Sequence, residues 1–296
     1  MNHNTNKKNF NPFGFCNSCN SIVEISEVNF FEYFNSSGKF CSACDNFDLY
    51  QFLKKTIDEN FMNNFIYSLL GAKNTIFQIT LEPDKKFELN FTDFQIPKAA
   101  KILNLNFTPN SDGGLFPIEM HNNHLYRGEI LDKIILYPAK LEKKVHKTVV
   151  AVSINWIDIT IIDDGYLYKS FLESFFCYVD KKYDSCILPL NIAIESKFSQ
   201  AIDFYNDKFL KIKKTSNITY NIYLNNIFPL IISNHNLIFP KEILNNLNKL
   251  RKARNNLAHT GKMVSVSKSI AVDYLSSAIF SFVYLKYFEM KLDLLK

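Results

Sequence analysis

Arginine is scarce in this chain of 296 residues. The 34 basic residues comprise 31 lysines and three arginines, Arg127, Arg251 and Arg254. Lysine therefore supplies most of the positive charge. An arginine differs from lysine because its guanidinium group is planar, permanently charged and shaped for bidentate contact with phosphate. Two of the three arginines lie in one stretch of four residues, which directs attention to that segment.

Long apolar runs are also missing. No stretch of 18 apolar residues occurs, which excludes a conventional transmembrane helix. Residues 1–9 lack the apolar core of a signal peptide and are predicted to form a polar tail. We therefore expect a cytoplasmic protein without a membrane partner. The hydrophobic share of 47% and aromatic share of 15% exclude disorder throughout the chain.

The length predicts about two domains with room for a third small module. Charge is divided unevenly: the net charge is −2 over residues 1–60, 0 over 61–163 and +7 over 164–296. A positive excess favours an anionic partner through long-range attraction, although it sets no specificity. Any such partner is therefore expected at the C-terminal part.

Four of the six cysteines form two pairs near the N-terminus, Cys16-Asn-Ser-Cys19 and Cys41-Ser-Ala-Cys44. A spacing of two residues lets both thiolates of a pair turn onto one metal, and two such pairs complete a tetrahedral zinc site. Residues 21–34 partly alternate in polarity and are rich in β-forming residues, which predicts strands between the pairs. The pattern resembles a zinc ribbon over about residues 10–50.

Other interpretations of this segment stay open. The cysteines would form disulfides in an oxidising compartment, although no secretory signal supports that. Zinc would serve a structural role, replacing a hydrophobic core in a module too small to have one. The nearby aromatic side chains would either stack on bases or dock the ribbon on the next domain. Cys177 and Cys186 lie in apolar helical surroundings and are interpreted as core thiols.

The middle region is predicted to be a mostly antiparallel sheet or sandwich. Short β-rich runs cover residues 75–81, 86–92, 129–137 and 149–160, and Pro83-Asp84, residues 110–114 and Pro138 are expected to break them. His121 and His124 are three residues apart without a third ligand nearby, so we interpret them as loop residues. No phosphate loop, nucleophile elbow or recognisable carboxylate pair occurs in this region.

After residue 165 the apolar period changes from two to 3.6, which predicts helices over 166–183, 186–212, 218–232 and 264–295. Another helix is expected between Pro240, a helix start, and Thr260-Gly261, a stop. The sequence thus predicts a multidomain α+β protein. Its parts are a polar tail (1–9), a zinc ribbon and connector (10–60), a mostly antiparallel β domain (61–164) and an all-α C-terminal bundle (165–296).

The helix after Pro240 carries an unusual arginine. At 100° per residue from Ile243, Arg254 falls at about 20°, inside a stripe of leucines. A guanidinium cannot stay unpaired in an apolar core, so it must meet an anion, a partner chain or a solvent-open cavity. An internal ion pair with Glu195 is the alternative. Arg251, Asn255 and His259 form a polar edge beside it.

The segment Leu250-Arg-Lys-Ala-Arg-Asn-Asn-Leu-Ala-His-Thr-Gly261 contains Arg254 and Asn255, three further residues, and then His259. It resembles the signature helix of HEPN domains, and residues 188–198, which include Glu195, are similar to their second helix. The resemblance covers about residues 165–296. It implies a metal-independent endoribonuclease of the toxin or antiphage abortive-infection type, with a composite site at a two-fold dimer interface.

The resemblance implies roles that match the chemistry of these side chains. His259 would exchange protons with the RNA 2′-hydroxyl or the leaving oxygen. Arg254 would stabilise charge at phosphorus, and Asn255 would orient His259 or the phosphate. Cleavage through the 2′-hydroxyl confines the activity to RNA. Supporting contacts to RNA are expected from four further residues: Lys249, Arg251, Lys252 and Glu195.

We expect a homodimer. Arg254 and His259 lie about 140° apart on an ideal helix, so one chain does not bring them together unless the last turn distorts or the Arg254 side chain curls round. Two copies related by a two-fold axis would bring both residue types together, and the chain has only one such motif. A phage-derived trigger or an inhibitory partner is implied by the family alone. Two other functions stay open: a non-catalytic HEPN-type module for dimerisation or nucleotide binding, and a zinc-ribbon adaptor for nucleic acid.

Overall fold

The chain forms two compact units in the computed structural model. The structure describes residues 13–16, 18–24, 27–35, 41, 43–44, 47–58, 72–109, 115–119, 129–130, 132–140, 147–158, 165–210, 219–261 and 265–293. One unit comprises residues 63–163 together with 1–11, and the other joins residues 12–62 to 164–296. We call them the β unit and the helical unit. The polar tail, Arg127 and the His121/His124 pair lie outside the described residues.

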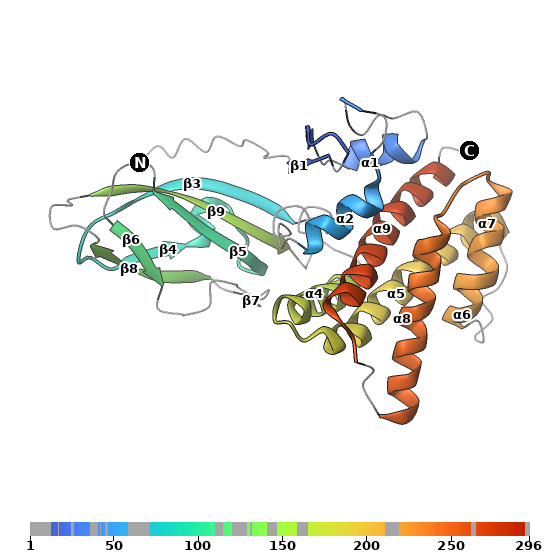
Figure 1. The fold of residues 1–296 in the computed structure, drawn as a ribbon. Helices are drawn as coiled ribbons and strands as arrows, with labels where there is room; N and C mark the ends of the chain where they lie inside the picture. The colour runs from blue at the N-terminus through green and yellow to red at the C-terminus, as the bar shows by residue number, and fades with distance from the viewer. Residues whose placement is uncertain are drawn as a thin grey trace. The chain divides into compact units, whose positions relative to one another are not determined.

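The β unit contains two sheets whose described pairings are all antiparallel (Figure 1). The larger sheet has the order β3 (Lys73–Leu81), β9 (Thr148–Asp158), β5 (Ala100–Pro109) and β7 (Glu129–Ile130). The smaller has the order β4 (Phe87–Asn90), β8 (Lys133–Lys140) and β6 (Leu115–Glu119). The expected mostly antiparallel β region is confirmed.

Alternating burial explains why the two sheets pack. Along β3 the side chains of Phe77, Ile79 and Leu81 are buried and those between them are exposed, the pattern of a strand with one face on a core. Both sheets contribute to that core, including Leu136 of β8 and Val152 of β9. The β unit is therefore a sandwich.

One expected break is absent. Pro138 lies inside β8 and stands opposite Pro117 of β6. Two prolines directly opposite each other require a non-hydrogen-bonded position of the ladder, because neither has an N–H to exchange. On the other side of β8, the pairing with β4 ends at Leu136, so Pro138 removes no donor from that ladder either. The prediction that Pro138 ends a strand is wrong for this reason, whereas Pro83 and Asp84 do form a turn.

Helices make up most of the helical unit. They are α1 (Glu27–Phe34), α2 (Leu49–Asp58), α4 (Gly165–Val179), α5 (Ile187–Tyr205), α6 (Tyr220–Ile222), α7 (Phe228–Asn234), α8 (Lys241–Thr260) and α9 (Lys268–Asp293). A π-helical turn, η3 (Asn206–Leu210), extends α5, and a second, η4 (Tyr223–Ile227), joins α6 to α7. Two short strands, β1 (Phe13–Phe15) and β2 (Ile22–Glu24), pair near the N-terminus. The helical C-terminal region is confirmed.

Helix α9 lies at the centre of this unit. Its buried residues point in every direction around the helix, as in a helix enclosed by protein on all sides. The N-terminal segment supplies part of that enclosure: the Phe34 ring of α1 lies 5.2 Å from the ring of Tyr284 and 5.5 Å from that of Phe280. Helices α1 and α2, which the sequence assigns to the N-terminal module, thus share one core with the C-terminal helices.

The segment between the cysteine pairs differs from the prediction made from its sequence. Residues 21–34 were expected to form strands, but only Ile22–Glu24 does, and Glu27–Phe34 is the helix α1. Phe31 and Phe34 are three residues apart, so one helical face carries both rings to Tyr287 of α9. A short apolar run fits either period, and packing on α9 decides the outcome.

Helix α8 begins after Pro240 and ends at Gly261, as the sequence predicts. Gly261 has a positive φ of 65°, and its N–H donates to the Leu257 carbonyl at 2.9 Å, which is a left-handed helix cap. The buried stripe of α8 extends only from Ile243 to Leu250. Leu257 is half-buried and Ala258 is exposed, so the last turns of α8 leave the core. In Figure 1 this end projects beyond the neighbouring helices.

Candidate functional site

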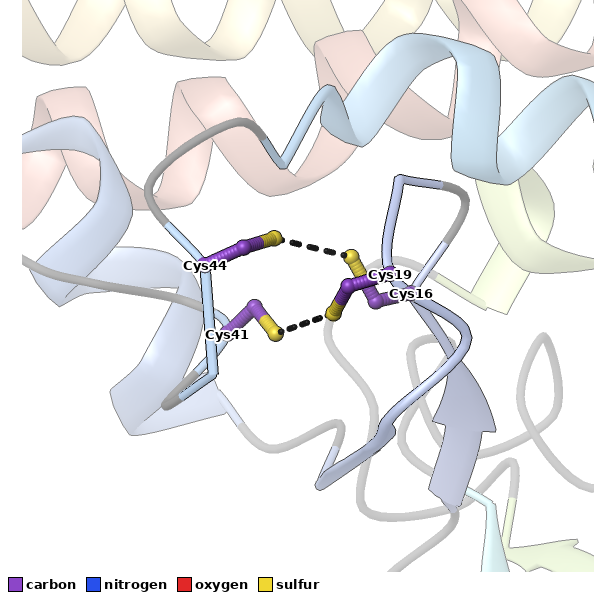
Figure 2. Close-up of side chains that lie close together, drawn as sticks. All are labelled: Cys16, Cys19, Cys41 and Cys44. Atoms are coloured by element: carbon purple, nitrogen blue, oxygen red, sulfur yellow. Dashed lines mark hydrogen bonds between the residues drawn. The ribbon is translucent and has the colours of Figure 1, made fainter.

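Four cysteine sulfurs from two separate turns converge in the helical unit (Figure 2). Their Sγ atoms all lie within 4.8 Å of one another. The shortest distances join one turn to the other: Cys16 to Cys44 and Cys19 to Cys41, each 3.5 Å between sulfurs. Tetrahedral zinc with bonds of about 2.3 Å places its ligand sulfurs about 3.8 Å apart. The donor set therefore fits one zinc ion, and all six cysteines are free thiols, which gives no support to disulfides.

The first turn is shaped by local hydrogen bonds. The Cys16 N–H donates to the Ser21 carbonyl at 2.8 Å, and the Asn20 N–H donates to the Cys16 carbonyl at 2.9 Å. Asn20 adopts a positive φ of 59°, which asparagine tolerates. A hydrogen bond with the Ser21 side chain is the main cause that lowers the pKa of the Cys19 thiol to about 6. The turn thus favours the thiolate, the form that binds metal.

The other two cysteines belong to a different environment. Cys186 is buried, its Sγ donates to the Lys182 carbonyl at 3.6 Å, and burial raises its pKa to about 12. This thiol is held in the unreactive form and is a core residue, as expected. Cys177 is half-buried in α4.

The cysteine-bearing segment is connected to α8 through a buried polar cluster. Asn246 of α8 donates to the Tyr50 hydroxyl at 2.8 Å and to the Ser277 hydroxyl at 3.3 Å. The Tyr50 and Ser277 hydroxyl oxygens are 3.2 Å apart. Lys54 of α2 forms a 2.7 Å ion pair with Asp273 of α9. Helix α2 is therefore attached to both α8 and α9.

The motif residues predicted to form an active site lie on the last three turns of α8. Arg254 and Asn255 are half-buried, and His259 is exposed. Arg254 Nη1 donates to Asn255 Oδ1 at 3.1 Å, so the two side chains are held together. Because α8 remains α-helical through Thr260, Arg254 and His259 leave the helix in different directions. One chain alone does not bring them together.

The guanidinium group of Arg254 has no acidic partner among the described residues. Its Nε is buried and lacks a hydrogen-bond acceptor, and the same is true of Nε in Arg251. No ion pair between Arg254 and Glu195 is formed in the described part of the chain. Instead, Glu195 accepts a hydrogen bond from Asn191 at 3.3 Å. The internal ion pair considered as the alternative for Arg254 is therefore not observed.

The four residues that were expected to support RNA binding differ in their exposure to solvent. Lys249 and Lys252 are exposed on α8 and lie beside the two arginines, where they add positive charge at the surface. Arg251 and Glu195 are half-buried. Both act electrostatically on the hydroxyl of Tyr220, whose ring lies 6.2 Å from that of Phe198 in α5.

Sequence reasoning missed Tyr220 and Asn191, both of which are buried. Asn191 precedes Glu195 by one helical turn, so the helix period places both on one face, and that signal was available. Tyr220 was not detectable in this way, because nothing in its local sequence reveals that α6 packs beside α5.

Comparisons with protein-family models, with curated proteins and with solved structures found no match for this chain. Within the described ranges, the helices are all too short or too polar to cross a membrane.

Proposed function

We propose that the protein is a metal-independent endoribonuclease of the HEPN type, acting as a homodimer. The observation that carries the proposal is the Arg254 guanidinium group, which is half-buried, bonded to Asn255 and without an acidic partner among the described residues. Its Nε is buried without an acceptor, which is unfavourable. A phosphodiester bound at this place would supply the missing negative charge.

The reaction uses atoms of the RNA and of α8 only. His259 removes the proton of a ribose 2′-hydroxyl, whose oxygen attacks the adjacent phosphorus while the bond from phosphorus to the 5′-oxygen breaks. The partner's His259 donates a proton to that leaving oxygen. Arg254 stabilises the negative charge that develops on phosphorus. The products are a 2′,3′-cyclic phosphate and a 5′-hydroxyl.

Three features support this assignment. His259 is exposed where α8 projects from the core, which leaves room for a second copy and for RNA. The helical part carries the positive excess of the chain. The cysteine cluster, by contrast, offers four sulfur ligands, which fill the tetrahedral positions of one zinc ion and suit a structural zinc rather than a catalytic one.

The biological role that accompanies this family is defence against phage by abortive infection, or toxicity in a toxin system. We extend the proposal to that role, with a phage component as the trigger or an inhibitory partner as the restraint. Zinc-dependent binding of nucleic acid by residues 10–60 is the competing function. Deleting these residues would not test it cleanly, because the deletion also removes Phe34 and Tyr50 from the core around α9.

The test is cleavage of labelled single-stranded RNA by the full-length protein. We expect cyclic-phosphate ends, no cleavage of DNA of the same sequence, and an unchanged rate when Mg²⁺ is chelated. His259→Ala and Arg254→Lys should each reduce the rate by about 10²-fold or more. His235→Gln is the matched control, because that histidine lies at the end of α7 beside the Tyr205 hydroxyl. If the wild type leaves RNA intact and His259→Ala does not change toxicity in cells, the proposal fails.

A further inference from the structure

The four cysteines of the cluster differ in their access to solvent. Cys16 is 1% exposed and Cys41 is 0% exposed, whereas Cys44 is half-buried and Cys19 is exposed. A small oxidant dissolved in water therefore reaches Cys19 more readily than the other three. Cys19 also has a buried neighbour, because the Cys41 sulfur lies 3.5 Å from its own. Redox-sensing cysteines combine these two features, an accessible sulfur and a second cysteine that resolves its oxidised form.

The sulfur contacts join the two turns in matched pairs. Cys19 lies opposite Cys41 and Cys16 lies opposite Cys44, with 3.5 Å between the sulfurs of each pair (Figure 2). The sulfurs of a disulfide are about 2.05 Å apart, so each pair has to close by about 1.5 Å. Rotation of the side chains supplies a movement of that size. The arrangement therefore favours two disulfides that run from one turn to the other.

A disulfide inside the first turn is the alternative, because Cys16 and Cys19 are only three residues apart in the sequence. Local contacts act against it. The Ser18 N–H donates to Cys16 Sγ at 3.4 Å, and the same sulfur contacts Cys44 of the second turn. A bridge to Cys19 has to turn the Cys16 sulfur away from both contacts, whereas a bridge to Cys44 shortens one of them.

Zinc binding and disulfide formation compete for the same sulfurs. Tetrahedral zinc at this site uses all four thiolates, and a disulfide sulfur carries no thiolate charge. One bridge thus removes two of the four ligands and leaves an incomplete site. Because the bridges join the same two turns that zinc joins, they replace this link rather than cut it. Oxidation is therefore expected to release the metal without separating the turns.

We propose that the cysteine cluster is a peroxide-sensitive zinc site, in which Cys19 reacts first and Cys41 resolves it. The Cys19 thiolate attacks one oxygen of hydrogen peroxide, and the O–O bond breaks to give a Cys19 sulfenic acid and a hydroxide ion. The Cys41 thiolate then attacks the Cys19 sulfur, so that an S–S bond forms, the S–O bond breaks and a second hydroxide leaves. Two protons from the solvent convert both hydroxides to water.

In this sequence the two sulfurs lose two electrons, which the peroxide gains. The zinc ion leaves as its ligands are consumed, and Cys16 and Cys44 are then joined by a second peroxide in the same way. Thiols of low molecular weight reverse both bridges by disulfide exchange, after which zinc binds again. This chemistry does not depend on RNA cleavage.

The test uses full-length protein that is loaded with zinc and freed of reductant. Hydrogen peroxide is added in steps up to about two molecules per chain, released zinc is measured with a colorimetric chelator, and the remaining thiols are alkylated at each step. Tandem mass spectrometry under non-reducing conditions then shows which cysteines escaped alkylation. We expect the Cys19–Cys41 bridge to appear first, loss of the bound zinc in step with it, and recovery of zinc binding after treatment with dithiothreitol.

Cys177→Ser is the matched control, because Cys177 is a half-buried thiol of α4 outside the cluster. This variant should lose its zinc at the same amount of peroxide as the wild type. Thermal unfolding gives a second readout. The oxidised, zinc-free protein should melt at a higher temperature than reduced protein from which a chelator has removed the zinc, because the bridges keep the two turns joined.

A first bridge between Cys16 and Cys19 overturns the proposal, as does zinc that stays bound after Cys19 has been oxidised. Oxidation of Cys177 before Cys19 also overturns it, because the cluster would then have no special sensitivity. The same holds if the oxidised protein melts no higher than the reduced, zinc-free protein, since the bridges would then not maintain the link between the turns.

Discussion

The two candidate sites of the helical unit differ in how completely one chain builds them. The cysteine cluster takes ligands from two distant turns, and its four sulfurs already meet at distances that suit a metal. The end of α8 takes its residues from one short segment, and its guanidinium groups lack acidic partners in the described structure. The first site can hold a metal within one chain, whereas the second, under the proposed function, requires RNA and a second copy. This difference predicts opposite effects of mutation on stability.

The largest effect is expected at the cysteine cluster. Cys41 is fully buried, and Cys41→Ser should abolish zinc binding and lower the free energy of unfolding of the helical unit by about 3 kcal/mol or more, because structural zinc binds with on the order of 10 kcal/mol. Metal analysis should find one zinc per wild-type chain and none in the variant. Cys177→Ser, which alters a thiol outside the cluster, should retain the metal. An equally stable wild type after zinc removal would contradict this prediction.

The docking of α1 on α9 should contribute the next largest effect. Phe34 is half-buried and its ring lies within 5.5 Å of three aromatic rings of α9. Phe34→Ala should destabilise the helical unit by about 2–3 kcal/mol, somewhat less than for a fully buried ring. Denaturant unfolding measures the loss. Phe31→Ala is the control with a smaller expected loss, because Phe31 contacts Tyr287 at the longer distance of 6.1 Å. Equal stability of the Phe34 variant and the wild type would show that α1 is not docked.

The end of α8 should respond in the opposite direction. Arg254→Leu replaces a half-buried guanidinium group, which has no acidic partner in the described chain, with an apolar side chain one turn after Leu250. We expect a gain of about 1 kcal/mol in the free energy of unfolding, accompanied by loss of RNA cleavage. Thermal unfolding of the variant and of the wild type, compared under the same conditions, measures the gain. Destabilisation by more than about 2 kcal/mol would instead indicate an internal partner for the guanidinium group.

The smallest effect is expected from the ion pair between Lys54 of α2 and Asp273 of α9. Lys54→Met should cost about 0.5 kcal/mol at neutral pH, because both partners of the pair are partly exposed. The Asp273 hydrogen bond raises the pKa of Lys54 above its ordinary value of 10.5. A cation with a raised folded pKa stabilises the protein below its unfolded pKa and loses that effect as the pH rises past the folded value. The difference between variant and wild type should therefore persist at pH 7 and vanish well above pH 10.5.

The sequence predicted different parts of the fold with different success. The limits of α8 follow from Pro240 and Gly261, whose backbone preferences act locally. The cysteine spacing predicts a metal site because the knuckle is itself a local structure. The helix Glu27–Phe34 was missed because its short apolar run fits both the helical and the strand period. The strand that contains Pro138 was missed because the opposite strand decides whether a proline can be accommodated at that position.

The amino-acid order by itself determined the local features: the two cysteine turns, the bounds of α8, the placement of Arg254 within its apolar stripe, and the angle between Arg254 and His259. Each depends on residues a few positions apart, whose geometry is set by the helix period and by backbone sterics. Only the tertiary structure decided that α1 and α2 pack on α9 and that Arg254 lacks an acidic partner in the described chain. These facts depend on segments distant in the sequence, which burial of apolar surface brings together.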